Sequence, residues 1–380
     1  PGFTEPWKKC RLGDYIRIFS GESPNCVSSK FGIIPYYKVE QLNWCEKYLG
    51  ETPYLSQRGK NILPEGCVVF SKRGAAILTN KVRMNLFPIN IDTNLMGIKA
   101  DNSFISDQYL FYFILRARLS RIADTSTIPQ INNIHINPIT IHVPSLEEQE
   151  KITRSLGLLD ERIATQRRLI EDFISLRRAL LQNAISRGLS KKSWKLTSLS
   201  DILTERGEKN SAGYNVCSVS VSEGVVNQIE YLGRSFAAKE TGHYNVARYG
   251  DIIYTKSPTG SFPYGIVKRN TQKLPAAISP LYGVFVPKYD WIGILLGYYF
   301  ESEVNTFNYL HPIIQKGAKN TINITNSGFL ANSVPLPTDE SEALTLAKCL
   351  DTISDKIILE KSILTHYTEQ REYLLSKMFV

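Results

Sequence analysis

Two segments of this chain carry apolar residues at alternating steps of three and four, and the two patterns coincide at an offset of 194 residues. An apolar repeat of about 3.5 residues keeps one face of a helix turned towards a partner helix, as in a coiled coil. Polar residues interrupt both patterns at the same two points. The first seam consists of Leu156, Leu159, Ile163, Gln166, Ile170, Phe173, Arg177, Leu180 and Ala184, and the second of Leu350, Ile353, Ile357, Glu360, Leu364, Tyr367, Arg371, Leu374 and Met378. We therefore predict two long helices that pack on each other, in antiparallel orientation, through these seams.

The duplication extends beyond the two helices. Residues 66–72 (GCVVFSK) return as 250–256 (GDIIYTK), and Val143-Pro144-Ser145 returns as Leu336-Pro337-Thr338. Self-similarity at such a long period indicates duplicated domains and not a solenoid of short repeats. The expected organisation is a first globular domain at 1–144, a first long helix at 145–187, a second globular domain at 188–335 and a second long helix at 336–380.

The globular parts are predicted to be of the α+β class, as two similar mixed α/β domains. Short apolar runs bounded by Gly, Pro and Asn predict strands at 67–70, 139–143, 216–221, 251–255 and 281–286. Helical spacing of apolar residues predicts one helix over 107–121 and a copy over 291–309. Capping boxes are expected to start the long helices at Ser145 and Thr338, and Gly188 is expected as the C′ residue that ends the first.

Composition excludes several classes of protein. The longest apolar run, 291–300, is too short to span a bilayer, and no signal-peptide pattern opens the sequence. The six cysteines never occur as C-x-x-C, so neither a zinc site nor a disulfide framework is supported. We expect a protein of the reducing cytoplasm.

A formal net charge of +9 favours a polyanionic partner, although charge alone is equally compatible with a basic protein that binds no nucleic acid. Here, the basic residues lie among Tyr, Asn, Gln and Ser in polar loops, and the loops after the repeated strands and before each long helix are expected to carry DNA recognition. Arg, Lys, Asn and Gln recognise base edges, and Ser and Thr bind phosphates. The candidate DNA-contacting residues are Lys38, Lys72, Arg73 and Gln130 in the first module and Lys256, Ser257, Thr259, Lys316 and Lys319 in the second.

Catalytic signatures are missing from the sequence. Neither G-x-x-x-x-G-K-[ST] nor G-x-G-x-x-G occurs, and the five histidines are scattered. Residues 137–140 (NPIT) lack the second proline and the aromatic residue of an amino-methyltransferase N-P-P-[FY] loop. An enzyme of unrecognised type is therefore a disfavoured alternative, and no cofactor or metal site is expected in this chain.

Four stretches together resemble the first conserved region of the specificity subunit of type I restriction–modification systems. They are 128–132 (IPQIN), 143–149 (VPSLEEQ), Leu159-Asp160 and 176–182 (LRRALLQ). The opening Pro1-Gly2-Phe3-Thr4 also resembles the start of that family, which usually has several more residues before it. The second helix departs from the pattern, because 336–342 (LPTDESE) replaces the usual entry, but the order of domains and helices matches over the whole chain.

The resemblance implies a non-catalytic chain that binds double-stranded DNA and recruits two methyltransferase (modification) subunits and, in the full complex, restriction/translocase subunits. Each recognition domain would recognise one half of a bipartite, asymmetric site, and the helices would set the spacer. S-adenosylmethionine, ATP and Mg²⁺ would be bound by the partner subunits. About 40 helical residues span roughly 60 Å, more than the roughly 34 Å of one DNA turn. The alternative is a coiled-coil scaffold that binds only protein partners.

Overall fold

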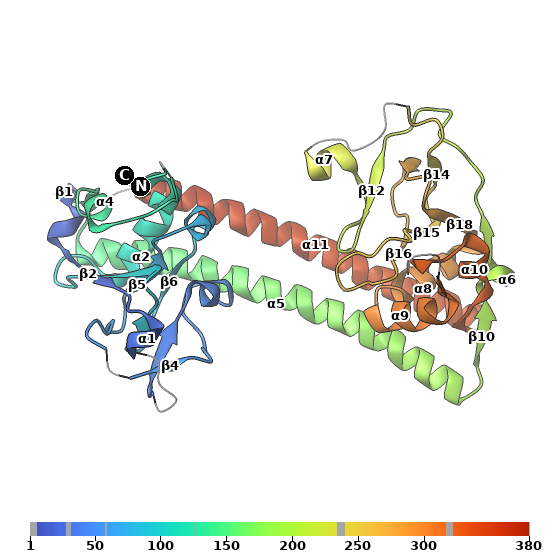
Figure 1. Ribbon diagram of the computed structural model, residues 1–380, viewed down its shortest axis with the longest axis horizontal. Coiled ribbons are helices and arrows are strands. Elements are labelled where there is room, and N and C mark those ends of the chain that lie inside the picture. The colour runs from blue at the N-terminus through green and yellow to red at the C-terminus, as the bar shows by residue number, and fades with distance from the viewer. Residues whose placement is uncertain are drawn as a thin grey trace. The chain divides into compact units, whose positions relative to one another are not determined.

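The computed structural model describes residues 6–27, 32–57, 59–125, 127–233, 240–316 and 322–379. The chain divides into two compact units: unit 1 contains residues 1–167 and 363–380, and unit 2 contains residues 168–362. Each unit combines a globular module with one stretch of helix α5 (Leu146–Ser190) and one stretch of helix α11 (Glu340–Met378) (Figure 1). We call residues 6–143 the first module and residues 194–337 the second module.

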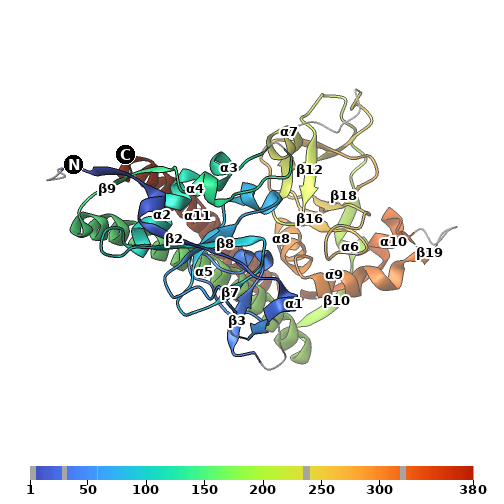
Figure 2. The ribbon, with the colours of Figure 1, turned by 60° about the vertical axis from the view of Figure 1, so that its left-hand side comes forward.

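The first module is built around a four-stranded antiparallel sheet of order β2–β8–β5–β6. A smaller sheet, β4–β3–β7, lies next to it, and β1 pairs with β9 where the module meets α5 (Figure 2). The strands are β1 (Lys8–Arg11), β2 (Ile16–Ser20), β3 (Ile34–Tyr37), β4 (Leu55–Ser56), β5 (Val68–Ser71), β6 (Val82–Met84), β7 (Asn90–Ile91), β8 (Leu95–Ala100) and β9 (Thr140–Val143). The helices are η1 (Leu12–Asp14), α1 (Pro24–Val27), η2 (Val39–Asn43), η3 (Ala75–Thr79), α2 (Asp107–Ala117), α3 (Leu119–Ile122) and α4 (Asn133–Ile136).

The second module has a four-stranded antiparallel sheet of order β11–β18–β15–β16, and β10 pairs with β21. Three further two-stranded pairings are β12–β13, β14–β17 and β19–β20. The strands are β10 (Trp194–Ser198), β11 (Leu203–Glu205), β12 (Cys217–Ser220), β13 (Gly224–Asn227), β14 (Asn245–Ala247), β15 (Ile252–Tyr254), β16 (Val267–Arg269), β17 (Ala276–Ile278), β18 (Gly283–Pro287), β19 (Gln315–Lys316), β20 (Ile322–Asn323) and β21 (Ser333–Pro337). The helices are α6 (Leu199–Ile202), α7 (Gln228–Leu232), α8 (Asp290–Tyr299), α9 (Glu303–Leu310), η4 (His311–Ile313) and α10 (Asn326–Ala331).

The two sheets repeat one topology. The strand from 66–72 is β5, its copy from 250–256 is β15, and both occupy the third position of a four-stranded sheet. The register agrees as well, since Val68 faces Ile98 in the first module and Ile252 faces Phe285 in the second. The α+β class and the internal duplication predicted from the sequence are therefore confirmed.

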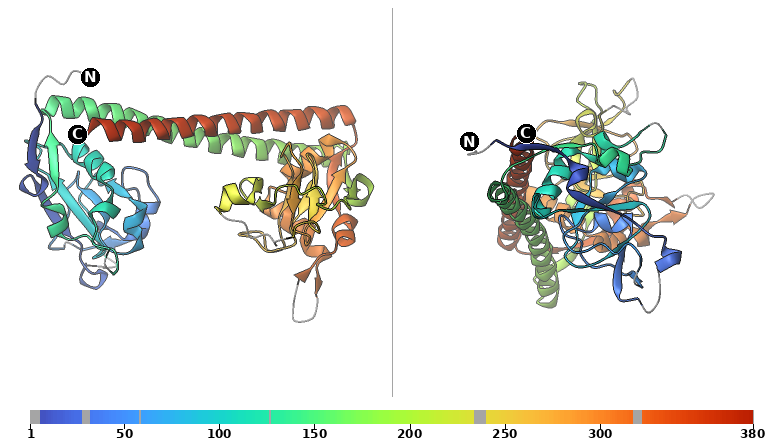
Figure 3. Two further views of the ribbon diagram at one scale, coloured as in Figure 1. Left: turned by 90° about the horizontal axis from the view of Figure 1, so that it is seen from above. Right: turned by 90° about the vertical axis from the view of Figure 1, so that its left-hand side faces the viewer.

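The seam residues form the inner faces of α5 and α11. None of the predicted seam positions is exposed, whereas the intervening positions are mostly exposed. In unit 1, Ile152 and Leu156 of α5 share a core with Leu375 and Phe379 of α11. In unit 2, Leu181 of α5 shares a core with Leu350 and other residues of α11. Figure 3 shows the two helices side by side, and the predicted coiled coil is confirmed.

The predicted helix over 107–121 is interrupted. It consists of α2 and α3, separated by Arg118, whose φ is +60°. The Asn80 side chain stabilises this break, because it donates to the Leu115 carbonyl (2.9 Å) and accepts from the Leu119 N–H (2.9 Å). The copy over 291–309 is likewise divided into α8 and α9, and Ser302 caps α9 by accepting from the Asn305 N–H (3.3 Å).

The two long helices begin in different ways. Ser145 caps α5 as predicted, since its hydroxyl accepts from the Glu148 N–H at 3.4 Å. The prediction for Thr338 is wrong: Asp339 caps α11 by accepting from the Ser341 N–H at 3.0 Å, and the Thr338 hydroxyl donates to the Ser193 carbonyl. The Asp339 carboxylate thus satisfies one of the N–H groups at the start of α11, and it places a negative charge at the positive end of the helix dipole.

Gly188 does not end α5, contrary to the prediction. The helix continues to Ser190, and Lys192, with φ of +59°, is the C′ residue. The Ser193 N–H donates to the Gly188 carbonyl (2.9 Å) and the Lys192 N–H to the Leu189 carbonyl (3.2 Å), which is a Schellman motif. A Cβ atom at position 188 would lie 1.9 Å from Cδ1 of the buried Trp194, so the glycine makes room for this indole.

This packing predicts opposite effects for two glycine substitutions in the same helix. Gly188→Ala should destabilise unit 2 by about 1–3 kcal/mol, because it forces Trp194 out of its place. Gly157→Ala should stabilise unit 1 by roughly 0.5–1 kcal/mol, because the nearest atom to its Cβ is 3.8 Å away and alanine is the better helix former. Chemical denaturation of both variants measures these changes, and equal effects would refute the packing role of Gly188.

Candidate nucleic-acid interface

Three of the four predicted DNA-contacting residues of the first module lie together. Lys72 and Arg73 follow β5, and Arg73 forms a β-bridge with Gln130, which belongs to the loop between α3 and α4. Two backbone hydrogen bonds form this bridge, from the Gly74 N–H to the Pro129 carbonyl and from the Ile131 N–H to the Lys72 carbonyl (both 2.8 Å). The Arg73 side chain is exposed, and the side chains of Lys72 and Gln130 are half-buried.

A buried carboxylate organises the neighbouring loop. Asp92, which follows β7, accepts from the Asn94 backbone N–H at 2.8 Å and from the Asn94 amide at 2.7 Å, and the Tyr36 hydroxyl donates to it at 3.3 Å. The Lys72 N–H in turn donates to the Asn94 carbonyl (2.9 Å). Burial lowers the pKa of Lys72, and the negative charge of Asp92 opposes this effect. Hydrogen bonds through Asn94 thus connect the backbone of Lys72 to Asp92, and the adjacent Arg73 side chain is exposed.

Lys38 lies at the end of β3, next to the same loop. The Asp92 N–H donates to the carbonyl of Tyr37, the residue that precedes Lys38. The Lys38 ammonium is 3.7 Å from the centroid of the Tyr54 ring, a cation–π geometry that already occupies it within the module. Lys38 thus lies beside the Lys72 loop and contacts Tyr54, whereas the Arg73 side chain is exposed.

The equivalent loop of the second module has a different structure. It starts at Lys256, whose φ is +58°, and it folds back on itself, because Thr259 and Phe262 exchange two backbone hydrogen bonds of 3.0 Å. The Thr259 hydroxyl donates to the Ser257 carbonyl (3.1 Å), and Ser257 is exposed. Burial lowers the pKa of Lys256, and Glu205 opposes the shift. Lys256, Ser257 and Thr259 therefore form one compact turn.

The remaining two candidates lie elsewhere in the chain. Lys316 is in β19, where it pairs with Ile322 of β20. Lys319 lies outside the described residues. The close grouping seen in the first module is therefore established in the second only for the Lys256 turn.

An arginine-lined cavity in unit 1 was not predicted. It has a volume of about 850 Å³, and its walls include Arg116, Arg118 and Arg121 from the α2–α3 junction together with Arg371 from α11. The sequence signal was available, because 116–121 (RARLSR) holds three arginines in six residues. The apolar periodicity of this segment predicts a helix, but periodicity does not report the positive charge that the segment carries.

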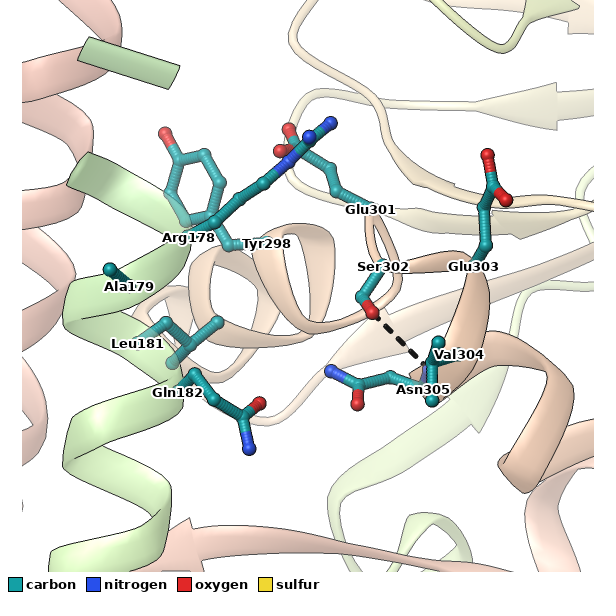
Figure 4. A pocket seen from close by; sticks show the side chains of 10 residues that line it. All are labelled: Arg178, Ala179, Leu181, Gln182, Tyr298, Glu301, Ser302, Glu303, Val304 and Asn305. Atoms are coloured by element: carbon teal, nitrogen blue, oxygen red, sulfur yellow. Dashed lines mark hydrogen bonds between the residues drawn. The ribbon is translucent and has the colours of Figure 1, made fainter. Parts of the chain in front are cut away.

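The corresponding cavity of unit 2 carries the opposite charge. It has a volume of about 420 Å³ and lies between α5 and the α8–α9 junction; Arg178 extends towards Glu301, and Glu303 lies on the opposite side (Figure 4). Two of the residues from α5 that line it, Arg178 and Leu181, are the repeat equivalents of Glu372 and Leu375 in the unit 1 cavity. Divergence between the two copies has thus affected this junction as well as the loops.

Metal-binding and membrane features are not found in the described part of the chain. Across these residues, His, Cys, Asp and Glu side chains form no group of three or more that could hold a metal ion. Within the described ranges, none of the helices has the length and the apolar character that crossing a bilayer would require.

The fold agrees with that of solved specificity subunits. The specificity subunit of the type I restriction–modification system from M. genitalium superposes with a TM-score of 0.60 at 13% identity, and the match covers 100% of this chain and 97% of that one. A second solved chain comes from a structural study of complex assembly and conformational transition of the type I restriction–modification system. It gives a TM-score of 0.56 at 16% identity, and the match covers 100% of this chain and 98% of that one. At these identities the likeness establishes a shared fold.

Sequence comparison finds a match in the first part of the chain. Residues 4–172 match the model of the type I restriction modification DNA specificity domain. Over 208 residues, the chain is 24% identical to the MjaVIII specificity subunit of Methanocaldococcus jannaschii. That match covers 52% of this chain and 46% of the curated relative, about half the length of each. The resemblance to type I specificity subunits inferred from the sequence is therefore confirmed.

Proposed function

We propose that this chain is the non-catalytic subunit that gives a type I restriction–modification complex its DNA specificity. One observation carries the proposal: β5 and β15 occupy the same place in two equivalent sheets, yet the loops that follow them differ in structure. The first loop is joined to the segment around Gln130, and the second closes on itself between Thr259 and Phe262. Two such surfaces would recognise two different half-sites of a bipartite, asymmetric sequence.

In this proposal the helices act as a spacer between the half-sites. The 45 residues of α5 would span roughly 65 Å at about 1.5 Å per residue. That length exceeds the roughly 34 Å of one DNA turn, which would allow contacts on one face of the duplex in successive turns. The complex would act in the cytoplasm, and its S-adenosylmethionine, ATP and Mg²⁺ would be bound by the partner subunits.

The exposed faces of the long helices would dock two methyltransferase subunits, and through them the restriction subunits. Arg168, Glu171 and Asp172 are exposed on α5, as is Arg167, which pairs with Glu46 of the first module. A pull-down with a tagged copy of this chain tests the docking. Retention of a methyltransferase subunit supports it, and failure to retain one contradicts it.

The central experiment is a genome-wide map of methylated adenines in cells with and without this chain. A bipartite motif that is methylated only when the chain is present would establish the function and give the spacer length. Unchanged methylation, in cells that contain both methyltransferase and chain, would refute it.

Salt dependence separates DNA recognition from the scaffold alternative. If the modules contact phosphates, the logarithm of the DNA association constant should fall linearly with the logarithm of salt concentration, by about 0.9 per phosphate contact. A site with six or more contacts would lose on the order of a thousandfold in affinity between 50 and 200 mM salt. Fluorescence anisotropy with a labelled duplex measures this slope, whereas a scaffold that binds only proteins would show no DNA binding at low salt.

A further inference from the structure

The polar interruptions of the two seams have a structural purpose that the sequence did not reveal. Arg177 and Arg371 are repeat equivalents, and each is bound within its own unit to a residue of the other long helix. A tyrosine from the adjacent module joins each pair, fully buried in unit 1 and partly buried in unit 2. We call Tyr112, Asp160 and Arg371 the first clamp, and Tyr298, Ser354 and Arg177 the second clamp.

In the first clamp, Asp160 connects a module to both long helices. The Tyr112 hydroxyl of α2 donates to Asp160 Oδ2 (2.7 Å), and Arg371 Nε of α11 donates to Asp160 Oδ1 (2.5 Å). Lys47 of the first module donates to the Tyr112 hydroxyl (2.9 Å). Tyr112 is fully buried, so its hydroxyl has exchanged solvent for these partners.

The second clamp has the same plan with the helices exchanged. The Tyr298 hydroxyl of α8 lies 2.7 Å from Asp351 Oδ1 and 2.6 Å from Ser354 Oγ, both on α11. Arg177 of α5 donates to Ser354 and lies 4.7 Å from the centroid of the Tyr298 ring. It also pairs with Glu301 at 2.6 Å, and Figure 4 shows Tyr298 and Glu301 beside α5.

Ser354 is the repeat equivalent of Asp160, so the two clamps differ in charge. In the first, Asp160 pairs with Arg371, and Lys47 bonds to the Tyr112 hydroxyl. In the second, Arg177 pairs with Glu301, and Asp351 bonds to the Tyr298 hydroxyl. In each clamp, nevertheless, a tyrosine of the module bonds to a polar residue of one long helix, and that residue is bonded to an arginine of the other long helix. A rotation of the module about the helices would break these short, directional bonds, whereas apolar side chains in the surrounding core tolerate sliding more easily.

We propose that the two clamps are positioning devices that fix the rotation of each recognition module on its helix pair, and thereby restrict the DNA spacer lengths that the complex accepts. The inference rests on the proposed function. It assigns to Tyr112, Tyr298, Arg177 and Arg371 a role in spacer selection, although none of them belongs to the candidate DNA-contacting loops.

The first test is the spacer preference of the methyltransferase complex carrying Tyr112→Phe or Tyr298→Phe. Each change keeps the ring and removes one hydroxyl that bonds to a carboxylate, on Asp160 or on Asp351. The preference for the natural spacer over spacers one base pair shorter or longer should therefore fall about tenfold or more. The matched controls are Tyr109→Phe and Tyr309→Phe, whose hydroxyls donate to His142 and Phe329 carbonyls inside their own modules.

The second test needs no DNA. Spin labels at the exposed positions Ser103 and Ser155, both in unit 1, report the placement of the first module on α5, with the exposed Cys349 replaced by serine. Tyr112→Phe should broaden the distance distribution between the labels, and Tyr109→Phe should leave it narrow. An unchanged distribution in Tyr112→Phe would overturn the clamp.

The two tests separate failure of the clamp from failure of the proposed function. Relaxed spacer preference together with a broadened distribution supports the inference. A broadened distribution in a complex that keeps its spacer preference overturns the role in spacer selection. If the unmodified complex methylates no DNA, the proposed function fails, and with it spacer selection, while the label distances still decide whether the clamp holds the module.

Discussion

Leu156→Asp is expected to unfold unit 1 under conditions in which the unmodified chain is stable. Leu156 is fully buried and contributes to the core that joins α5, α11 and the first module. Aspartate at this position would lose the packing of the leucine and bury a charge without a partner, at a cost of about 3–5 kcal/mol. That is a large part of the stability of a typical domain. Denaturant titration followed by circular dichroism measures the loss.

The matched control lies two residues further along the same helix. Leu158 is 54% exposed, so Leu158→Asp removes a leucine and adds the same charge without touching the seam. Its free energy of unfolding should stay within about 0.5 kcal/mol of the unmodified chain. Equal losses for the two variants would contradict the assignment of Leu156 to the helix interface.

Arg73→Ala is expected to weaken recognition of one half-site only. Arg73 is the exposed cation of a loop that is otherwise held by backbone bonds to the segment around Gln130. Loss of a contact to a base edge should cost about 1–3 kcal/mol at the affected position and relax its sequence preference. A panel of DNA duplexes with single changes in each half-site, assayed for methylation by the reconstituted complex, measures this effect.

Lys256→Ala provides the reciprocal variant, since it should affect the other half-site. Arg187→Ala is the control for charge alone, because Arg187 is an exposed cation on α5, outside both modules. A uniform loss over all duplexes would identify Arg73 as a phosphate contact. If neither Arg73→Ala nor Lys256→Ala changed affinity or preference, the recognition surface would lie in other loops.

The duplicated architecture could be predicted because it depends on local patterns that were copied together. The seams, the repeated strands and the Ser145 cap all follow from spacing and residue type within short windows. The role of Gly188 could not be predicted in this way, because it depends on the Trp194 indole. The Schellman turn brings this indole against the glycine. The break at Arg118 depends in the same way on Asn80, about 40 residues away in the chain.

The candidate interface was partly predictable for a similar reason. Lys72 and Arg73 follow a repeated strand, so their place at equivalent points of two sheets followed from the sequence. The bridge between Arg73 and Gln130 is a long-range contact, and no periodicity reports it. The clamps were visible only as polar interruptions at Arg177 and Arg371. Their role depends on long-range contacts that no local pattern reports: Arg177 lies over the Tyr298 ring, and Arg371 shares Asp160 with Tyr112.

Because unit 1 consists of two separate stretches of the chain, its two stretches leave the ribosome at different times. Unit 2 is one uninterrupted stretch of chain, residues 168–362, whereas unit 1 needs residues 363–380. Phe379 packs on Tyr109 and Phe113 of α2, and its ring lies 4.9 Å from that of Tyr109. Domains usually fold from the N-terminus onwards as the ribosome delivers them. Here the first module, although it precedes unit 2 in the chain, can complete its core only after the C-terminal part of α11 has left the ribosome.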